Sequence, residues 1–91
     1  MGFWDNKTAL VTGGSSGLGR VIAEAFAVAG AKVAVVGLEP QQVEQAAAEM
    51  RADGRDVLGI AADITRQDDV GRMIAQILDR FGRLDVLVNN A

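Results

Sequence analysis

The sequence predicts an open α/β fold, a doubly wound parallel sheet with helices on both faces. Short, uniformly apolar runs alternate with longer segments in which apolar residues recur at helical spacing, and a glycine follows each longer segment. Uniformly apolar runs are typical of strands buried on both faces, whereas a period near 3.6 residues is typical of helices. The 91 residues suffice for one domain, and the expected element order is βαβαβαβ.

The first half of the chain is expected to form two strand–helix units. The first strand is predicted at Thr8–Val11 and the second at 32–36. A helix is expected from about Gly17, and Gly30 stands where a glycine commonly follows a helix. Pro40 suits the first turn of the next helix, where its missing N–H costs nothing. The apolar stripes of these helices are Leu18, Ile22, Ala25, Phe26 and Ala29, and then Val43, Ala46, Ala47 and Met50.

The second half continues the alternation. A third strand is predicted at Val57–Ala61 and a fourth at Val86–Val88. Between them, Thr65 with Asp68 three residues later resembles a capping box at the start of a helix, and Gly82 ends that helix. Its apolar stripe is Val70, Met73, Ile74, Ile77, Leu78 and Phe81.

Right-handed crossovers restrict the topology of such a chain and favour the strand order 3-2-1-4, the first half of a doubly wound nucleotide-binding fold. The sheet then reverses direction between strands 1 and 4, and ligands bind beyond the carboxyl ends of the strands at that switch point. Residues 13–19 follow the first strand, and Asn89–Asn90 follow the fourth. This coincidence is the main structural argument for a nucleotide site.

The composition excludes several classes of function. Nine basic residues against twelve acidic ones give a net charge of −3, which argues against a nucleic-acid interface. The chain has no Cys, His or Tyr, so it offers no disulfide, thiolate metal site, Ser-His-Asp triad, HExxH zinc helix or phenolic acid. The doublet Asp68–Asp69 is interpreted as a solvated first helical turn, and no metal is expected.

Targeting and membrane signals are not expected. The N-terminus lacks the basic and apolar regions of a signal peptide, and Asn6 occupies the position where a myristoylation signal needs Ser or Thr. The apolar stretch Val21–Ala31 is too short to span a bilayer. We therefore expect a cytoplasmic protein without membrane contact.

The turn Thr12–Gly19 after the first strand has the features of a pyrophosphate site. Glycine permits positive φ and removes the Cβ that would keep the backbone from a phosphate. The helix that follows directs N–H donors and the positive end of its dipole at the turn, to which Ser15 and Ser16 add hydroxyl groups. The alternative is a glycine-rich connection that serves only close helix–strand packing; the strand, helix and switch point favour the phosphate site.

Two other phosphate-related interpretations are disfavoured. Gly14–Gly19 has the glycine spacing of a P-loop, but Arg20 and Val21 stand where Lys and Ser or Thr are needed, and Val21 cannot ligate Mg²⁺. A phosphoacceptor receiver domain would use Asp63 at the end of the third strand. Such a domain also needs acidic residues after its first strand, where this chain has Thr12 and glycine.

Three motifs in order resemble the N-terminal, cofactor-binding part of the classical short-chain dehydrogenase/reductase family. Thr12–Gly19 is similar to the family's T-G-x-x-x-G-x-G motif, Ala62–Thr65 to its segment after the third strand, and Asn89–Ala91 to the start of its N-N-A-G motif. Residues 83–88 resemble the lead-in to that last motif. The resemblance covers essentially the whole chain. It implies that residues 1–91 form a partial Rossmann-like NAD(P)-binding domain, truncated before the catalytic region.

The resemblance also implies roles for individual residues. The pyrophosphate and the nearby ribose would be held by Gly13, Ser15, Ser16, Gly17, Leu18 and Gly19. Asp63 would accept a hydrogen bond from the adenine amino group, and Ile64 would pack beside the ring. Asn90 and Ala91 would lie along the cofactor, and Asn89 would brace the sheet. Two alternatives stay open: Asp63 caps the turn into the third helix, and both asparagines are turn residues that tolerate left-handed φ.

The choice between NAD and NADP depends on the end of the second strand. An acidic side chain there bonds the ribose 2′-hydroxyl, whereas an arginine accommodates a 2′-phosphate. In the family the acid aligns with Gly37 and the basic residue with Leu38, and this chain has neither. Glu39 is near enough to take the part of the acid, so NAD is favoured over NADP.

Catalytic residues are not assigned, because the family's Asn, Ser and Tyr-x-x-x-Lys lie beyond the N-N-A-G motif. With no Tyr, and with Lys7 and Lys32 as the only lysines, we expect no hydride transfer to or from an alcohol or carbonyl substrate by this chain alone. The chain is then either the cofactor half of an NAD(P)-dependent oxidoreductase or a non-catalytic nucleotide-binding or interaction module. Its fourth strand would be an open edge, so marginal stability or self-association is expected.

Overall fold

The computed structural model describes residues 2–90 and contains the elements in the predicted order. They are β1 (Thr8–Thr12), α1 (Gly17–Val28), β2 (Lys32–Gly37), α2 (Pro40–Ala52), β3 (Val57–Ala61), α3 (Gln67–Phe81) and β4 (Val86–Asn89). β1, β2 and β4 each extend one residue beyond the predicted run, because the ladder continues there: Thr12 pairs with both Val36 and Asn89, and Gly37 pairs with Ala61.

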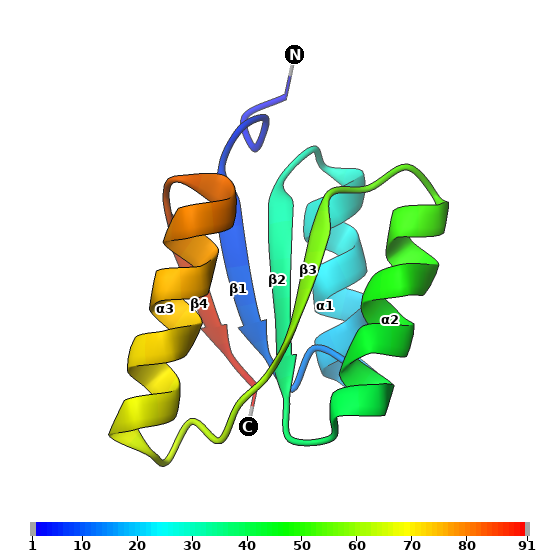
Figure 1. Ribbon diagram of the computed structural model, residues 1–91. Helices are drawn as coiled ribbons and strands as arrows, with labels where there is room; N and C mark the ends of the chain where they lie inside the picture. Colours follow the sequence, from blue (N-terminus) through cyan, green and yellow to red (C-terminus); the bar gives the residue numbers. More distant parts are fainter. Residues whose placement is uncertain (1, 91) are drawn as a thin grey trace.

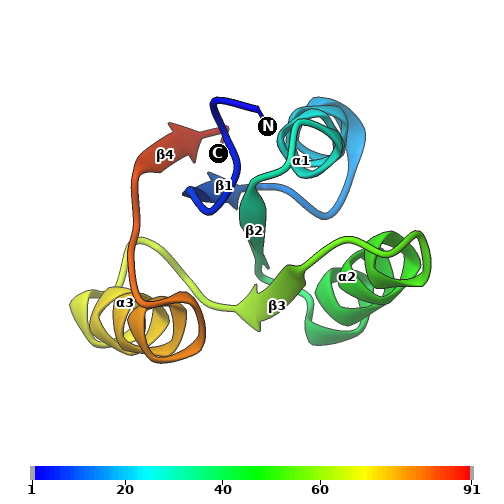
Figure 2. The ribbon, with the colours of Figure 1, turned by 90° about the horizontal axis from the view of Figure 1, so that it is seen from above.

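All neighbouring strands pair in parallel, in the order β3-β2-β1-β4, which confirms the predicted topology (Figure 1). The carboxyl ends of the strands therefore lie along one edge of the sheet, the lower edge in Figure 1. Viewed along the strands, α1 and α2 cover one face of the sheet and α3 covers the other (Figure 2). This is the three-layer arrangement that alternating strands and helices predict.

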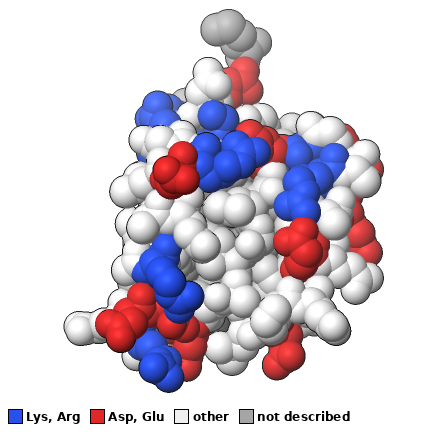
Figure 3. All heavy atoms as spheres, in the orientation of Figure 1, with Lys and Arg blue, Asp and Glu red and all other residues white. Residues whose placement is uncertain are grey.

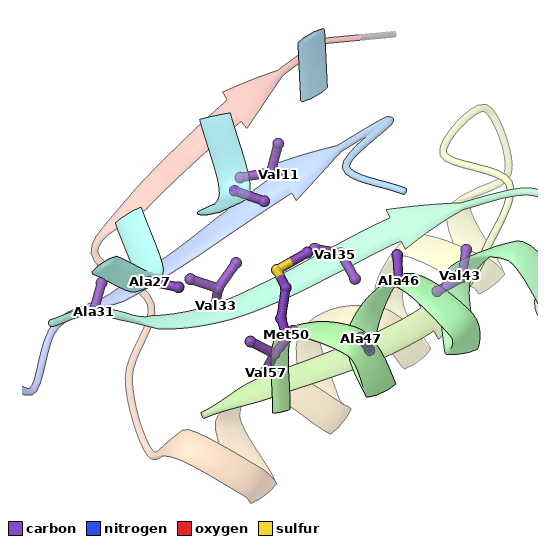
Figure 4. Close-up of a cluster of buried hydrophobic side chains, with 11 residues drawn as sticks. Val11, Ala27, Ala31, Val33, Val35, Val43, Ala46, Ala47, Met50 and Val57 are labelled. Atoms are coloured by element: carbon purple, nitrogen blue, oxygen red, sulfur yellow. The ribbon is translucent and has the colours of Figure 1, made fainter. Parts of the chain in front are cut away.

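The core consists of two apolar clusters, one on each face of the sheet. Alternate residues of β2 point to opposite faces, so Val33 and Val35 join the cluster under α1 and α2, while Ala34 and Val36 join the cluster under α3. Figure 4 shows the first cluster, in which the Met50 side chain of α2 reaches toward the valines of β2. On the other face, Ile77 is fully buried, which stabilises the fold by about 1.5–3 kcal/mol.

The capping box predicted at the start of α3 is wrong. The N-cap is Arg66, without a side-chain cap, and α3 begins at Gln67. The Thr65 hydroxyl instead donates to Asp63 Oδ1 at 2.6 Å. Asp69, rather than Asp68, reaches back over the turn, where its Oδ2 accepts the Asp63 N–H at 2.8 Å. The carboxylates of Asp63 and Asp69 thus accept hydrogen bonds within the turn, and no capping box forms at the start of α3.

β4 is one of the two edge strands of the described sheet, β3 being the other, and α1 also has an exposed apolar flank. Leu87 on β4 is 61% exposed. Leu18, Val21 and Val28 on α1 are also largely exposed, although a helix with so many apolar side chains is usually covered on several sides. Trp4 packs edge-on against Phe26 of α1, with ring centroids 4.9 Å apart, and so ties the N-terminal segment to this helix.

Charged side chains of both signs lie together in small groups on the surface (Figure 3). Arg80 pairs with Asp56 at 2.6 Å, and Arg20 pairs with Glu24 at 2.9 Å and with Glu49 at 2.6 Å. The last contact links α1 to α2. Among residues 2–90, no helix has the length and apolarity needed to cross a membrane.

Candidate functional site

A cavity of about 350 Å³ opens at the carboxyl edge of the sheet, beside the glycine-rich turn. The ends of β1, β2 and β3, with the segments that follow them, form its walls. The lining residues are Thr12, Gly13, Ser15, Val36, Gly37, Leu38, Glu39, Gln42, Ala62, Asp63, Ile64 and Thr65. Three regions that are far apart in the sequence thus meet around this cavity: the glycine turn, the end of β2 and the Asp63 segment.

The glycine turn adopts a backbone that favours glycine. Gly13 and Gly17 have φ of 65° and 58°. The Gly13 N–H donates to the Val36 carbonyl at 2.7 Å, which fixes the turn to the end of β2. A Cβ at Gly17 would meet nothing within 4 Å. Gly17 is therefore needed for its backbone angle, and the space above it is open to a ligand.

Gly19 has a different function from Gly17. A Cβ at Gly19 would overlap the Gly13 carbonyl oxygen and would lie 2.7 Å from Asn90 Nδ2. The first turn of α1 therefore rests directly on the glycine turn and on the end of β4. The packing interpretation of the turn is correct for Gly19, whereas Gly17 leaves the room that a phosphate would need.

Thr12 joins the ends of β1 and β4. Its buried hydroxyl donates to Asn89 Oδ1 at 3.0 Å and accepts the Asn90 N–H at 3.0 Å. Asn89 belongs to β4 and braces the sheet as expected. The alternative that Asn89 and Asn90 are left-handed turn residues is wrong, because within residues 2–90 Asn6 is the only non-glycine residue with positive φ.

Asp63 shapes the turn between β3 and α3. Its Oδ1 accepts hydrogen bonds from the Thr65 hydroxyl at 2.6 Å and from the Thr65 N–H at 3.0 Å. The Thr65 hydroxyl, followed by its N–H, holds the pKa of the Asp63 carboxyl below its usual value. The group is thus a charged acceptor at neutral pH. The capping alternative is correct in that Asp63 closes the turn before α3, but Asp63 does not cap the start of the helix, where the N-cap is Arg66.

The other predicted residues divide between the cavity and its surroundings. Leu38 and Glu39 line the mouth of the cavity and are exposed, whereas Ser15 is buried in its wall. Ser16 and Leu18 are exposed on the turn outside the lining, and Asn90 contacts Gly13 instead of lining the cavity. Ala91 lies outside the described residues.

Sequence reasoning missed two contributors. Gln42, one helical turn after Glu39, also lines the cavity, and that spacing was a signal available from the sequence. Arg66 lies near enough to Asp63 and Asp69 to lower the pKa values of both carboxyls, although other contacts contribute more. Arg66 does not belong to the lining.

Parallel strands in the order 3-2-1-4, a glycine turn at the switch point and a cavity across the strand ends define an open, doubly wound α/β domain of the Rossmann type. The family model described as short chain dehydrogenase matches residues 7–91.

Curated proteins similar to this chain carry names of the same family or of dehydrogenases. The chain is 46% identical over 85 residues to the short chain dehydrogenase/reductase dpchG of Colletotrichum higginsianum, covering 93% of this chain and 32% of that protein. It is 44% identical over 87 residues to the sorbitol dehydrogenase of Cereibacter sphaeroides, covering 96% of this chain and 33% of that protein.

Solved structures give the same result. A citronellol catabolism dehydrogenase (AtuB) of Pseudomonas aeruginosa PAO1 superposes with a TM-score of 0.90 at 40% identity, covering 97% of this chain and 37% of that one. A short chain dehydrogenase/reductase from Burkholderia phymatum in complex with NAD superposes with a TM-score of 0.89 at 30% identity, covering 96% and 31%. The chain belongs to the short-chain dehydrogenase/reductase family of oxidoreductases. It spans about one third of the length of the curated relatives it matches.

Proposed function

We propose that this chain forms the NAD-binding part of an oxidoreductase that transfers hydride between a nicotinamide cofactor and an alcohol or carbonyl substrate. The observation that carries this proposal is the cavity across the three strand ends, with the open space above Gly17 beside it. The complex of the Burkholderia relative with NAD supports the choice of a nicotinamide cofactor. When bound, the nicotinamide supplies the hydride chemistry.

The residues present fit the adenosine diphosphate portion of such a cofactor. The backbone of the turn from Gly13 to Gly19, with the hydroxyls of Ser15 and Ser16, would hold the pyrophosphate at the start of α1, with Leu18 beside it. Leu38 and Ile64 line the cavity and would give the adenine ring apolar walls, and the Asp63 carboxylate would accept a hydrogen bond from its amino group. Asn90 and Ala91 would follow along the cofactor.

We propose NAD rather than NADP because of the charges at the cavity. Glu39, two residues after β2 at the N-cap of α2, lines the cavity and would accept a hydrogen bond from the ribose 2′-hydroxyl. A 2′-phosphate would meet this carboxylate, and the lining contains no Lys or Arg among the described residues.

Calorimetric titration of the 91-residue chain with NAD⁺ and NADP⁺ tests this proposal. We expect NAD⁺ to bind more tightly. Glu39→Gln should reduce the ratio of NAD⁺ affinity to NADP⁺ affinity by about tenfold, because a hydrogen bond to a charged group contributes about 1.5 kcal/mol or more. Asp79→Asn removes an exposed carboxylate on α3 and serves as the charge-matched control. Tighter binding of NADP⁺ by the wild type would refute the NAD assignment, and binding of neither would refute the function.

The alternative is a non-catalytic nucleotide-binding or interaction module. Residues 1–91 contain no Tyr and no Lys after Lys32, so these residues include no acid of the family's kind. We expect no alcohol oxidation or carbonyl reduction by the 91 residues in the presence of NAD(H). Turnover by the purified chain would contradict this expectation. The intact mass of the native protein then separates an oxidoreductase fragment from a stand-alone module.

We also propose that the isolated chain self-associates through the β4 edge. An open parallel edge invites pairing with a second chain, and Leu87 presents an apolar side chain beside it. Sedimentation velocity should show dimers or larger species. Leu87→Glu should reduce this association, whereas Leu78→Glu, a substitution of the partly exposed leucine on α3, should not. A monomer at all concentrations would contradict the proposal.

A further inference from the structure

The segment from Ala62 to Arg66 connects β3 to α3, and four of its residues line the cavity: Ala62, Asp63, Ile64 and Thr65. Its first N–H, that of Ala62, continues the sheet by donating to the Gly37 carbonyl at 2.9 Å, and its last, that of Arg66, donates to the Asp63 carbonyl at 3.0 Å. Between these points the segment presents Asp63 and Ile64 to the cavity. The direction in which Asp63 points thus depends on the contacts made inside this short turn.

Asp69 supplies the link between this turn and α3. Its Oδ2 accepts the Asp63 N–H at 2.8 Å, and its Oδ1 forms an ion pair with Arg72 one helical turn later. Both carboxylate oxygens are therefore engaged, and the side chain is only 21% exposed. The pKa of Asp69 lies below its usual value, chiefly because of the hydrogen bond from the Asp63 N–H.

The consequence for Asp63 is that its backbone and one carboxylate oxygen are fixed. Asp69 holds the N–H, and Thr65 occupies Oδ1. Oδ2 makes no hydrogen bond within residues 2–90, so this oxygen is the one left for a ligand donor. Without Asp69, the Asp63 N–H would lose its acceptor, and the turn would lose the side-chain hydrogen bond that ties it to the first turn of α3.

We infer that Asp69 is a positioning residue for the adenine end of the dinucleotide. It touches the turn rather than the cavity, and it acts by holding Asp63 and Ile64 in the orientation that recognises the ring. The inference rests on the proposed function, because it assumes that a dinucleotide occupies the cavity. It assigns to Asp69 a role that its neighbour Asp68, exposed in the same helical turn, does not share.

The test compares Asp69→Ala with Asp69→Asn and Asp68→Ala, using the 91-residue chain and three ligands. NAD⁺ and AMP contain adenine, whereas nicotinamide mononucleotide does not. Loss of one hydrogen bond should weaken AMP and NAD⁺ binding by about five- to tenfold in Asp69→Ala. Binding of nicotinamide mononucleotide should not change. Asp69→Asn keeps an acceptor oxygen and should restore AMP affinity to within about twofold of the wild type, and Asp68→Ala should match the wild type.

A second measurement keeps the inference testable if Asp69→Ala does not fold. Asp69→Ser keeps a polar side chain that is too short to reach the Asp63 N–H, so amide exchange at Asp63 should become faster and AMP binding weaker. Unchanged AMP affinity in Asp69→Ala or Asp69→Ser would overturn the inference, as would an equal loss for all three ligands or a failure of Asp69→Asn to rescue. Failure of the wild type to bind NAD⁺ would instead refute the proposed function, and with it the role of Asp69.

Discussion

Replacing Gly19 by alanine tests the close seating of α1 on the glycine turn. A Cβ at this position would overlap the Gly13 carbonyl oxygen and would lie 2.6 Å from the carbonyl carbon and 2.7 Å from Asn90 Nδ2. Carbon atoms in contact normally lie about 3.5–4.0 Å apart, so the start of α1 must move by about 1 Å. The obstacle is backbone, which cannot turn aside as a flexible side chain can.

The expected loss of stability follows from these contacts. Overpacking of this kind costs about 1–3 kcal/mol, and alanine recovers at most about 1 kcal/mol through its helix propensity. Because the clash is with backbone, we expect a net loss of about 2 kcal/mol. For a domain of this size, that corresponds to a decrease in Tm of about 10 °C.

Gly71→Ala provides the matched control. Gly71 lies inside α3 with no positive φ, and a Cβ there would meet nothing within 4 Å, so alanine should stabilise the fold by about 0.5–1 kcal/mol. Both variants are compared with the wild type by thermal and urea unfolding. Unfolding is monitored by far-UV circular dichroism and by the fluorescence of Trp4, which packs against Phe26 of α1. If Gly19→Ala matched the wild type or gained stability as Gly71→Ala does, α1 would not rest on the turn as described.

Three further predictions concern the site and its surroundings. Thr12→Val removes the hydroxyl that hydrogen-bonds Asn89 and Asn90, so the free energy of unfolding measured in urea should fall by about 1–3 kcal/mol and NAD⁺ should bind more weakly. Thr12→Ser keeps the hydroxyl and should keep the NAD⁺ affinity. Equal losses of affinity in the two variants would contradict the role of the hydroxyl. Gly17→Ala should lower the free energy of unfolding by about 1 kcal/mol because the φ of residue 17 is positive, and it should also weaken NAD⁺ binding. Gly54→Ala, at an equally open positive-φ site away from the cavity, should leave NAD⁺ affinity unchanged. Arg83 and the Thr8 N–H lower the pKa of Asp85 in the folded state, so its contribution to stability is present above the unfolded pKa of about 3.9 and disappears as pH falls through the folded value. In Asp85→Asn, the free energy of unfolding measured in urea should therefore fall less steeply as the pH is lowered below about 4. An unchanged pH dependence would show that this carboxylate does not contribute.

The elements were predictable because each has a regular signal in the chain. Strands buried on both faces are apolar throughout, as in Val33–Val36, and the position of Gly82 after α3 matches its left-handed φ of 81°. The start of α3 was predicted one residue early because Thr65 and Asp68 match a capping pattern by spacing alone. Spacing does not show that the Thr65 hydroxyl has a nearer acceptor in Asp63.

The candidate site was predictable as a set of residues but not as a set of contacts. The glycines of the turn look alike in the sequence, yet Gly19 is required by its neighbours and Gly17 by its backbone angle and the open space above it. The hydrogen bond from the Asp63 N–H to Asp69 has no periodic signature, because it depends on the path of the turn. Such contacts appear only when the turn is folded.

The place of β4 beside β1 affects the order in which the site forms. β1, β2 and β3 are joined by short crossovers, whereas Thr12 and Asn89 are 77 positions apart in the sequence. Pairing over such a separation carries a larger loop-closure entropy, so β4 is expected to dock last. Asn90 reaches Gly13 and Gly19 only in that step. A nucleotide bound at the turn would then stabilise contacts formed after the folding transition state, and it would prolong the lifetime of the folded chain rather than accelerate its folding.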